Sequence, residues 1–142
     1  ESVGLKEKHF ERRASDLSGG QQQRVGIARA FILDPMVVLA DEPVASLDPK
    51  ISWEVLNILK NAAKQRGTSV ICSLHQVELA KEFADRIIGM HDGEIVSDCA
   101  AKDLDAKTIH KIYEGHEEEL QEQLVAPERF DETALTNPVA YA

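Results

Sequence analysis

Two adjacent carboxylates stand where a short apolar run ends. The run "MVVLA", residues 36–40, is followed directly by Asp41 and Glu42. A short, continuous, β-branched run is typical of a strand buried on both faces in a parallel sheet. Ligands of open α/β sheets bind beyond the carboxyl ends of such strands. Because side chains alternate along a strand, one carboxylate can hold Mg²⁺ while the other meets an attacking water. The bland alternative is a surface turn that carries two acids.

A glycine pair precedes the first helical pattern of the chain. The stretch "LSGGQQQR" places Ser18, Gly19, Gly20 and Gln21 where apolar residues begin to recur at helical spacing. Glycines at a helix start let backbone N–H groups approach an anion closely, and the helix dipole favours negative charge there. Ser18 adds a hydroxyl and Gln21 an amide. The stretch therefore predicts a phosphate-recognition device, with an ordinary glycine-rich helix cap as the alternative.

Two further polar residues follow these stretches. His75 comes just past a second apolar run, "SVICSL", where its side chain would enter the same crevice as Glu42. A histidine at such a place also fits a purely structural role. Asp48 stands directly before Pro49, and an Asp-Pro pair is a strong helix start, so Asp48 could be no more than a cap.

Alternating strands and helices would position these residues. Apolar spacing predicts helices over residues 18–33, 49–66, 76–84 and 103–113, and buried strands over 36–40 and 69–74. The pair Asp92-Gly93 between "RIIGM" and "EIVSD" predicts a hairpin, and polar residues 6–16 indicate a loop. The pattern favours an α/β fold with a mostly parallel sheet flanked by helices. A further helix is expected to about residue 125, followed by a loosely ordered end.

The composition narrows the classes of function. The chain has 142 residues and a net charge of −9, of which eight acids and one base from Glu114 onward supply −7. The remaining residues carry −2, and this near balance argues against a nucleic-acid binder. Cys72 and Cys99 are expected to be reduced. No apolar run approaches the ~18 residues needed to span a membrane, so a membrane role would require a partner.

The order of these stretches resembles that of the ATP-binding cassette ATPases. "LSGGQ" (17–21) is similar to the signature motif, "VVLADE" (37–42) to the Walker B strand and "SLD" (46–48) to the D-loop, while His75 occupies the switch-histidine position. "ADEPVASLDP" followed by "LHQVELA" (74–80) is similar to the ATPase subunits of phosphonate importers. Amino-acid importers, with DEPTSALD-like strings, and lipoprotein exporters, with DEPTGNLD-like strings, stay alternatives.

The resemblance implies ATP and Mg²⁺ as cofactors and gives the residues roles. Two cassettes would sandwich two ATP molecules head to tail. Asp41 would help position Mg²⁺, Glu42 would polarise the attacking water, and His75 would hold the γ-phosphate. Asp48 would cross the dimer interface. The γ-phosphate of ATP held by the second subunit would be contacted by Ser18, Gly19, Gly20 and Gln21.

The resemblance also implies partners and a location. The ATPase subunit and a second copy of it would form a head-to-tail homodimer. ATP binding and hydrolysis in this dimer would drive transmembrane permease subunits, and a periplasmic binding protein would be engaged indirectly. The assembly would lie at the cytoplasmic face of the bacterial inner membrane, and no nucleic acid is expected. DNA-repair ATPases carry similar motifs, but they insert long coiled coils, and no sustained heptads occur in this chain.

The phosphate-binding P-loop pattern G-x-x-x-x-G-K-[S/T] is absent from the sequence. In the family this motif and the glutamine loop lie upstream of the signature. We therefore expect residues 1–113 to be the C-terminal part of a nucleotide-binding domain and residues 114–142 to be an acidic tail. The 142-residue chain alone is expected to bind ATP weakly and to be inactive. The alternative is a non-catalytic piece that binds a partner through the acidic tail.

Overall fold

The computed structural model describes residues 3–124, which form two units. The first contains residues 3–87 and 99–104, and the second contains residues 88–98 and 105–124. Every candidate site residue lies in the first unit. None of the helices in the described part of the chain combines the length and apolar character that a membrane span requires. The expected boundary after residue 113 stays a prediction.

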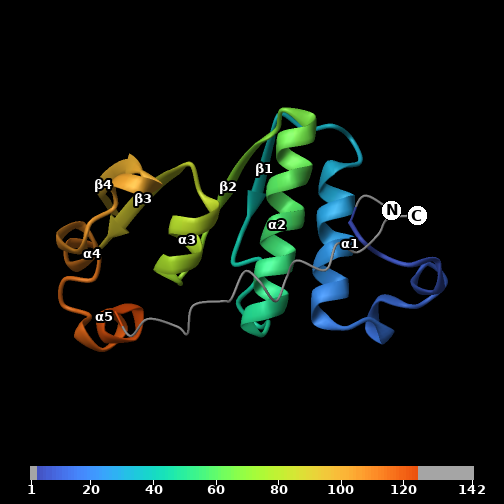
Figure 1. Ribbon diagram of the computed structural model, residues 1–142, viewed down its shortest axis with the longest axis horizontal. Coiled ribbons are helices and arrows are strands. Elements are labelled where there is room, and N and C mark those ends of the chain that lie inside the picture. The colour runs from blue at the N-terminus through green and yellow to red at the C-terminus, as the bar shows by residue number, and fades with distance from the viewer. Residues whose placement is uncertain (1–2, 125–142) are drawn as a thin grey trace. The chain divides into compact units, whose positions relative to one another are not determined.

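The first unit is built on two parallel strands and two helices. Strand β1 (Val37–Ala40) pairs in parallel with β2 (Ser69–Cys72), with Ala40 opposite Cys72. Helices α1 (Gly19–Phe31) and α2 (Pro49–Arg66) lie side by side, and α2 contacts β2 (Figure 1). The α/β prediction is confirmed. Parallel pairing is confined, within residues 3–124, to β1 and β2.

The core lies where α1 and α2 meet one face of this sheet. Phe31 of α1, Val38 of β1 and the α2 residues Val55 and Leu56 are buried together. Trp53 stacks edge-on against Phe83, with 5.8 Å between ring centroids. Helix α2 therefore holds the first unit together, because it packs against α1, against β1 and against Phe83.

The prediction that both strands are buried on two faces is wrong. Val38 is buried, but Leu39 and Ile71 are 75% and 64% exposed, and Val37 is exposed as well. Neighbouring side chains of a strand point to opposite faces, and both helices pack on the face that carries Val38. The opposite face therefore presents apolar side chains to solvent.

Helix α2 begins and ends as its sequence predicts. The Asp48 carboxylate accepts a hydrogen bond from the Ile51 N–H at 3.0 Å, and Pro49 occupies the first turn. At the other end Gly67 adopts the left-handed conformation, with φ of 64°, which glycine tolerates without a Cβ clash. These caps fix where the chain enters and leaves α2.

Shorter elements complete the described chain. The predicted loop 6–16 contains two 3₁₀ turns, η1 (Glu7–His9) and η2 (Ala14–Asp16), and helix α3 (Val77–Phe83) follows β2. Strands β3 (Arg86–His91) and β4 (Glu94–Ala100) pair with each other. The remaining elements are η3 (Ala101–Asp103), α4 (Ala106–Ile112) and α5 (Glu117–Leu124).

The hairpin prediction is confirmed by its turn. Asp92 and Gly93 have φ of 46° and 79°, and positive φ at both central residues is what a type I′ turn requires. The loosely ordered end that the sequence predicts lies outside the described residues.

Candidate functional site

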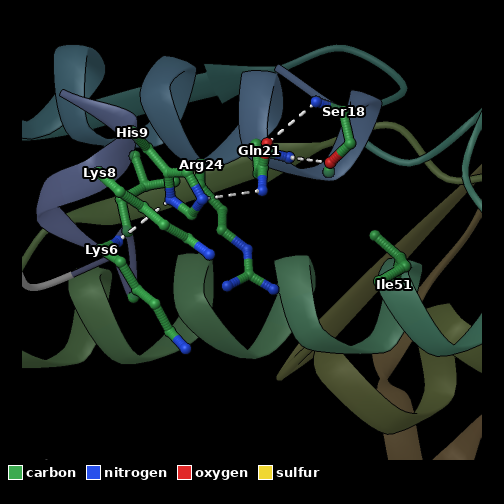
Figure 2. Close-up of a pocket in the computed structure, with 10 residues that line it drawn as sticks. Lys6, Lys8, His9, Ser18, Gln21, Arg24 and Ile51 are labelled. Atoms are coloured by element: carbon green, nitrogen blue, oxygen red, sulfur yellow. Dashed lines mark hydrogen bonds between the residues drawn. The ribbon is translucent and has the colours of Figure 1, made fainter. Parts of the chain in front are cut away.

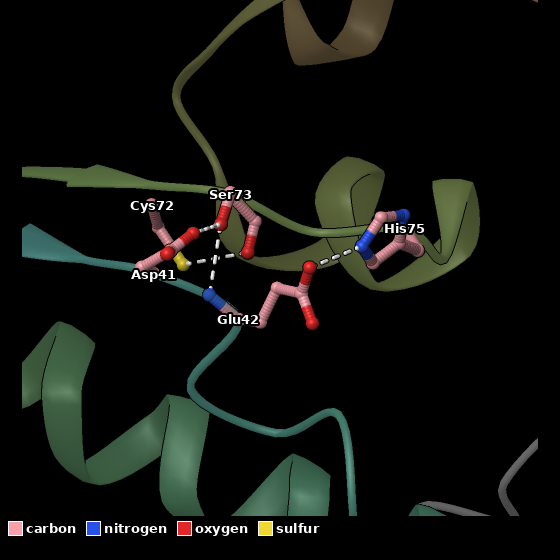
Figure 3. A network of polar contacts seen from close by, with 5 residues as sticks. All are labelled: Asp41, Glu42, Cys72, Ser73 and His75. Carbon is pink, nitrogen blue, oxygen red and sulfur yellow. Dashed lines mark hydrogen bonds and ion pairs between the residues drawn. The ribbon is translucent and has the colours of Figure 1, made fainter.

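The carboxyl ends of β1 and β2 bring Glu42 and His75 into contact. Glu42 Oε1 and His75 Nε2 are 2.7 Å apart, although 33 residues separate them in the sequence (Figure 3). Their side chains remain 48% and 76% exposed. Because the histidine is so exposed, it is not a buried packing residue, and the pair can meet a ligand from solution.

Asp41 is held by Ser73, a residue that sequence reasoning missed. The Ser73 hydroxyl donates to Asp41 Oδ1 at 2.7 Å and accepts the Glu42 N–H at 2.8 Å (Figure 3). The signal that could have identified Ser73 is its position, two residues before His75 at the end of an apolar run. The strand end therefore carries a connected polar network rather than isolated acids.

The two carboxylates have different partners, as the alternation along a strand predicts. Asp41 meets Ser73, whereas Glu42 meets His75 (Figure 3). Glu42 also has a positive φ of 41°. For a non-glycine residue such a conformation costs about 1–3 kcal/mol and persists where its surroundings enforce it. The backbone is therefore bent at the residue whose side chain faces His75.

The start of α1 is a reciprocal capping box. The Gln21 N–H donates to Ser18 Oγ at 3.4 Å, and the Ser18 N–H donates to Gln21 Oε1 at 3.0 Å. Both side chains are thus engaged with the helix start itself. The N–H groups of the first helical turn have no carbonyl partner within the helix, so the dipole and these donors still favour an anion there.

The glycine pair has a packing role that the sequence did not reveal. A Cβ on Gly20 would lie 2.5 Å from Ile51 Cγ2, and one on Gly19 would lie 3.0 Å from Leu47 Cδ2. Leu47 and Ile51 flank Asp48, the cap of α2. The absence of side chains therefore lets the start of α1 sit directly against the start of α2, in addition to any role in approaching an anion.

A basic pocket of about 330 Å³ adjoins the same helix start (Figure 2). Lys6, Lys8 and Arg24 line it together with Ser18 and Gln21. The Arg24 guanidinium also forms an ion pair with the Glu54 carboxylate of α2 at 2.6 Å. The Nε of Arg24 is buried without a hydrogen-bond partner. Positive side chains around a helix N-terminus give the pocket the charge that an anionic group requires.

His9 also lines this pocket. Its Nδ1 lies 3.3 Å from the Lys6 N, which donates to it, and its Nε2 lies 3.5 Å from Gln21 Nε2. Desolvation, followed by the positive charge of Lys8, lowers the pKa of His9 from its ordinary value of 6.5. A neutral His9 therefore lies beside the Gln21 amide near pH 7.

The strand-end carboxylates fit a magnesium ion that brings most of its own ligands. No group of three or more His, Cys, Asp or Glu residues within residues 3–124 could hold a metal ion. Mg²⁺ is usually bound by one or two carboxylates, with waters and substrate phosphates completing its shell. Exposed Asp41 and Glu42 suit that arrangement, whereas an all-protein metal cage is not formed by the described residues.

The chain is similar in sequence to known proteins of one family. The family model described as ABC transporter matches residues 1–45. The phosphonates import ATP-binding protein of Hydrogenovibrio crunogenus is 59% identical over 112 residues, which are 79% of this chain and 41% of that protein. The chain belongs to the ABC transporter family. A phosphonates import ATP-binding protein of Thiobacillus denitrificans is 48% identical over 99% of this ABC transporter chain and 49% of its own length.

One similar protein is named for the import of another solute. The phosphite import ATP-binding protein of Stutzerimonas stutzeri is 51% identical over 80% of this chain and 41% of its own length. The ABC transporter chain thus spans less than half the length of these curated relatives.

Solved structures show the same fold. A dimeric ATP-binding cassette in a post-hydrolysis state with ADP and Pi matches with a TM-score of 0.61 and 35% identity, over 72% of this chain and 44% of the other. The ABC transporter chain therefore has the α/β fold of ATP-binding cassettes over the matched part.

Proposed function

We propose that this chain forms the signature, Walker B, D-loop and switch-histidine part of the ATP-hydrolysing subunit of a phosphonate importer. The observation that carries the proposal is the 2.7 Å contact between Glu42 and His75 at the shared end of two parallel strands. Relatives that are 48–59% identical are named as phosphonate import ATP-binding proteins, which supports both the reaction and the class of solute.

The strand-end groups divide the work of hydrolysis. Glu42 polarises the attacking water with its carboxylate, and His75 donates a hydrogen bond to the γ-phosphate, where negative charge develops. Asp41, held by Ser73, would bind Mg²⁺ directly or through water. The ion would neutralise phosphate charge when bound. The exposure of Glu42 and His75 leaves both side chains accessible to nucleotide.

The start of α1 would serve the nucleotide site of a second subunit. Ser18, Gly19, Gly20 and Gln21 would bind the γ-phosphate of ATP held by a second subunit, and Asp48 would lie at that interface. Lys6 and Lys8, in the basic pocket, would strengthen anion binding at the same helix start. The dimeric cassettes among the similar structures support a pair of such subunits, and the head-to-tail arrangement of the pair is part of this proposal.

The dimer would drive transmembrane permease subunits at the cytoplasmic face of the bacterial inner membrane and engage a periplasmic binding protein indirectly. Phosphite is a second candidate solute, because one relative of 51% identity is named for phosphite import. Uptake of a labelled alkylphosphonate and of phosphite, by cells with and without the gene, separates the two solutes. Uptake of neither would contradict both assignments.

The proposed reaction is tested by phosphate release from Mg-ATP, using the complete protein that carries this sequence. His75→Ala should lower kcat by a factor on the order of 100, because a donor aimed at developing charge is lost. His110→Ala is the matched control, because His110 is an exposed histidine of α4 in the second unit. Equal turnover of wild type and His75→Ala would contradict the role of His75.

The 142-residue chain alone should behave differently. Its sequence contains no G-x-x-x-x-G-K-[S/T] pattern, and that cradle and its lysine supply most of the phosphate binding in such ATPases. We expect weak Mg-ATP binding and no turnover from this chain. A calorimetric titration that gives micromolar affinity would refute this expectation.

A further inference from the structure

Ser73 contacts three consecutive residues of the neighbouring strand end. Its backbone N–H donates to the Ala40 carbonyl at 3.0 Å and continues the β1–β2 ladder. Its hydroxyl donates to Asp41 Oδ1 at 2.7 Å and accepts the Glu42 N–H at 2.8 Å. The ladder bond is available to any residue except proline, but the other two bonds require the hydroxyl.

The hydroxyl acts on both carboxylate residues at once. By donating to one oxygen of Asp41, it limits rotation of that carboxylate. By accepting the Glu42 N–H, it anchors the backbone at the point where φ is +41°, a conformation that needs support from its surroundings. From this bent backbone the Glu42 side chain reaches His75 (Figure 3).

We propose that Ser73 is a positioning residue for the hydrolytic site. Its hydroxyl restrains the Asp41 carboxylate, which would bind Mg²⁺, and holds Glu42 in the backbone conformation that places its carboxylate beside His75. This role follows the general rule that groups behind a ligand fix its orientation and tune its strength. The inference rests on the proposed function, because it assigns Asp41 and Glu42 their places in ATP hydrolysis.

The first experiment measures the network without any reaction. Amide hydrogen exchange at Glu42 is followed in the 142-residue chain for wild type, Ser73→Ala and Ser73→Thr. Loss of one hydrogen bond should speed exchange at this amide by roughly three- to tenfold in Ser73→Ala. Ser73→Thr should retain wild-type exchange, because threonine keeps the hydroxyl.

A matched control separates this effect from a general weakening of the strand. Ser69 is an exposed serine at the first position of β2, the strand that ends just before Ser73, and it lies opposite Val37 at the other end of the ladder. Ser69→Ala should leave exchange at Glu42 unchanged. Unchanged exchange in Ser73→Ala, or equal acceleration in Ser69→Ala, would overturn the proposed anchoring.

The second experiment tests the functional half in the complete protein. Ser73→Ala should raise the Mg²⁺ concentration for half-maximal ATP hydrolysis and lower kcat, each by about three- to tenfold, while Ser73→Thr restores both. If wild type hydrolyses ATP and Ser73→Ala matches it in both quantities, the positioning role fails. If wild type shows no hydrolysis, the proposed function fails, and the exchange result still decides whether Ser73 anchors Glu42.

Discussion

Replacement of Gly20 by alanine tests how tightly the start of α1 is fixed against α2. Gly20 is buried, and an added Cβ would lie 2.5 Å from Ile51 Cγ2. Carbon atoms pack comfortably at about 3.5–4.0 Å, so the helices or the Ile51 side chain must move by roughly 1 Å. The glycine is thus a requirement of packing as well as of backbone freedom.

The change in stability caused by Gly20→Ala combines two opposing effects. Forcing a methyl group into a packed site costs about 1–3 kcal/mol, whereas alanine gains up to ~1 kcal/mol over glycine in a helix. Gly26, on the same helix, has nothing within 4 Å of the Cβ position. Gly26→Ala should therefore stabilise the chain by up to ~1 kcal/mol, and Gly20→Ala should be about 1–3 kcal/mol less stable than that control.

Urea unfolding followed by circular dichroism gives the free energies. Both alanine variants are measured in wild type and in an Ile51→Ala background, which removes the Cγ2 atom that a new Cβ would meet. In that background the difference between the two glycine sites should shrink markedly, as expected for residues in direct contact. Equal stabilisation by Gly20→Ala and Gly26→Ala in the wild-type background would refute the close approach of α1 and α2.

Three further perturbations follow from the structure. Asp48→Ala should destabilise the chain by ~1 kcal/mol and Asp48→Asn should not, because asparagine caps a helix as well as aspartate; equal urea midpoints for the two variants would count against the cap. Burial raises the pKa of the Cys72 thiol from 9.0 to about 11, so alkylation by iodoacetamide in a Cys99→Ser variant should reach half its maximal rate near pH 11, and a midpoint near pH 9 would contradict this. For the same reason Cys72 lowers the free energy of unfolding as pH rises above 9, because the thiol then ionises in the unfolded state but stays protonated in the folded one. The exposed face that carries Leu39 and Ile71 should cause self-association, which Leu39→Lys should reduce in light scattering; a monomer at every concentration would argue against it.

Local signals in the sequence are sufficient to place the helices that carry the site. Asp48-Pro49 and Gly67 mark both ends of α2, because capping and left-handed backbone depend on single residues. The serine before the glycine pair likewise marks the start of α1. The contact between Glu42 and His75 also follows from the sequence, because parallel strands end at the same edge of a sheet.

Other features of the site depend on how segments far apart in the sequence pack together, which local sequence patterns do not reveal. The double hydrogen bond of Ser73 requires the register that sets Ala40 opposite Cys72. The need for glycine at position 20 arises only when α2 lies against α1. The expectation that Leu39 and Ile71 are buried failed because an apolar run shows that burial is favourable, without showing what covers each face.

The role of Glu42 in hydrolysis is tested most directly by the kcat of Mg-ATP hydrolysis for Glu42→Gln in the complete protein, with nucleotide binding measured in parallel. Glutamine keeps the size of the side chain but loses the charge that polarises water. We predict that ATP binding is retained and that kcat falls by a factor on the order of 100 or more, within the range of general-base effects. An unchanged kcat would contradict the assignment of Glu42 and His75 as the hydrolytic pair.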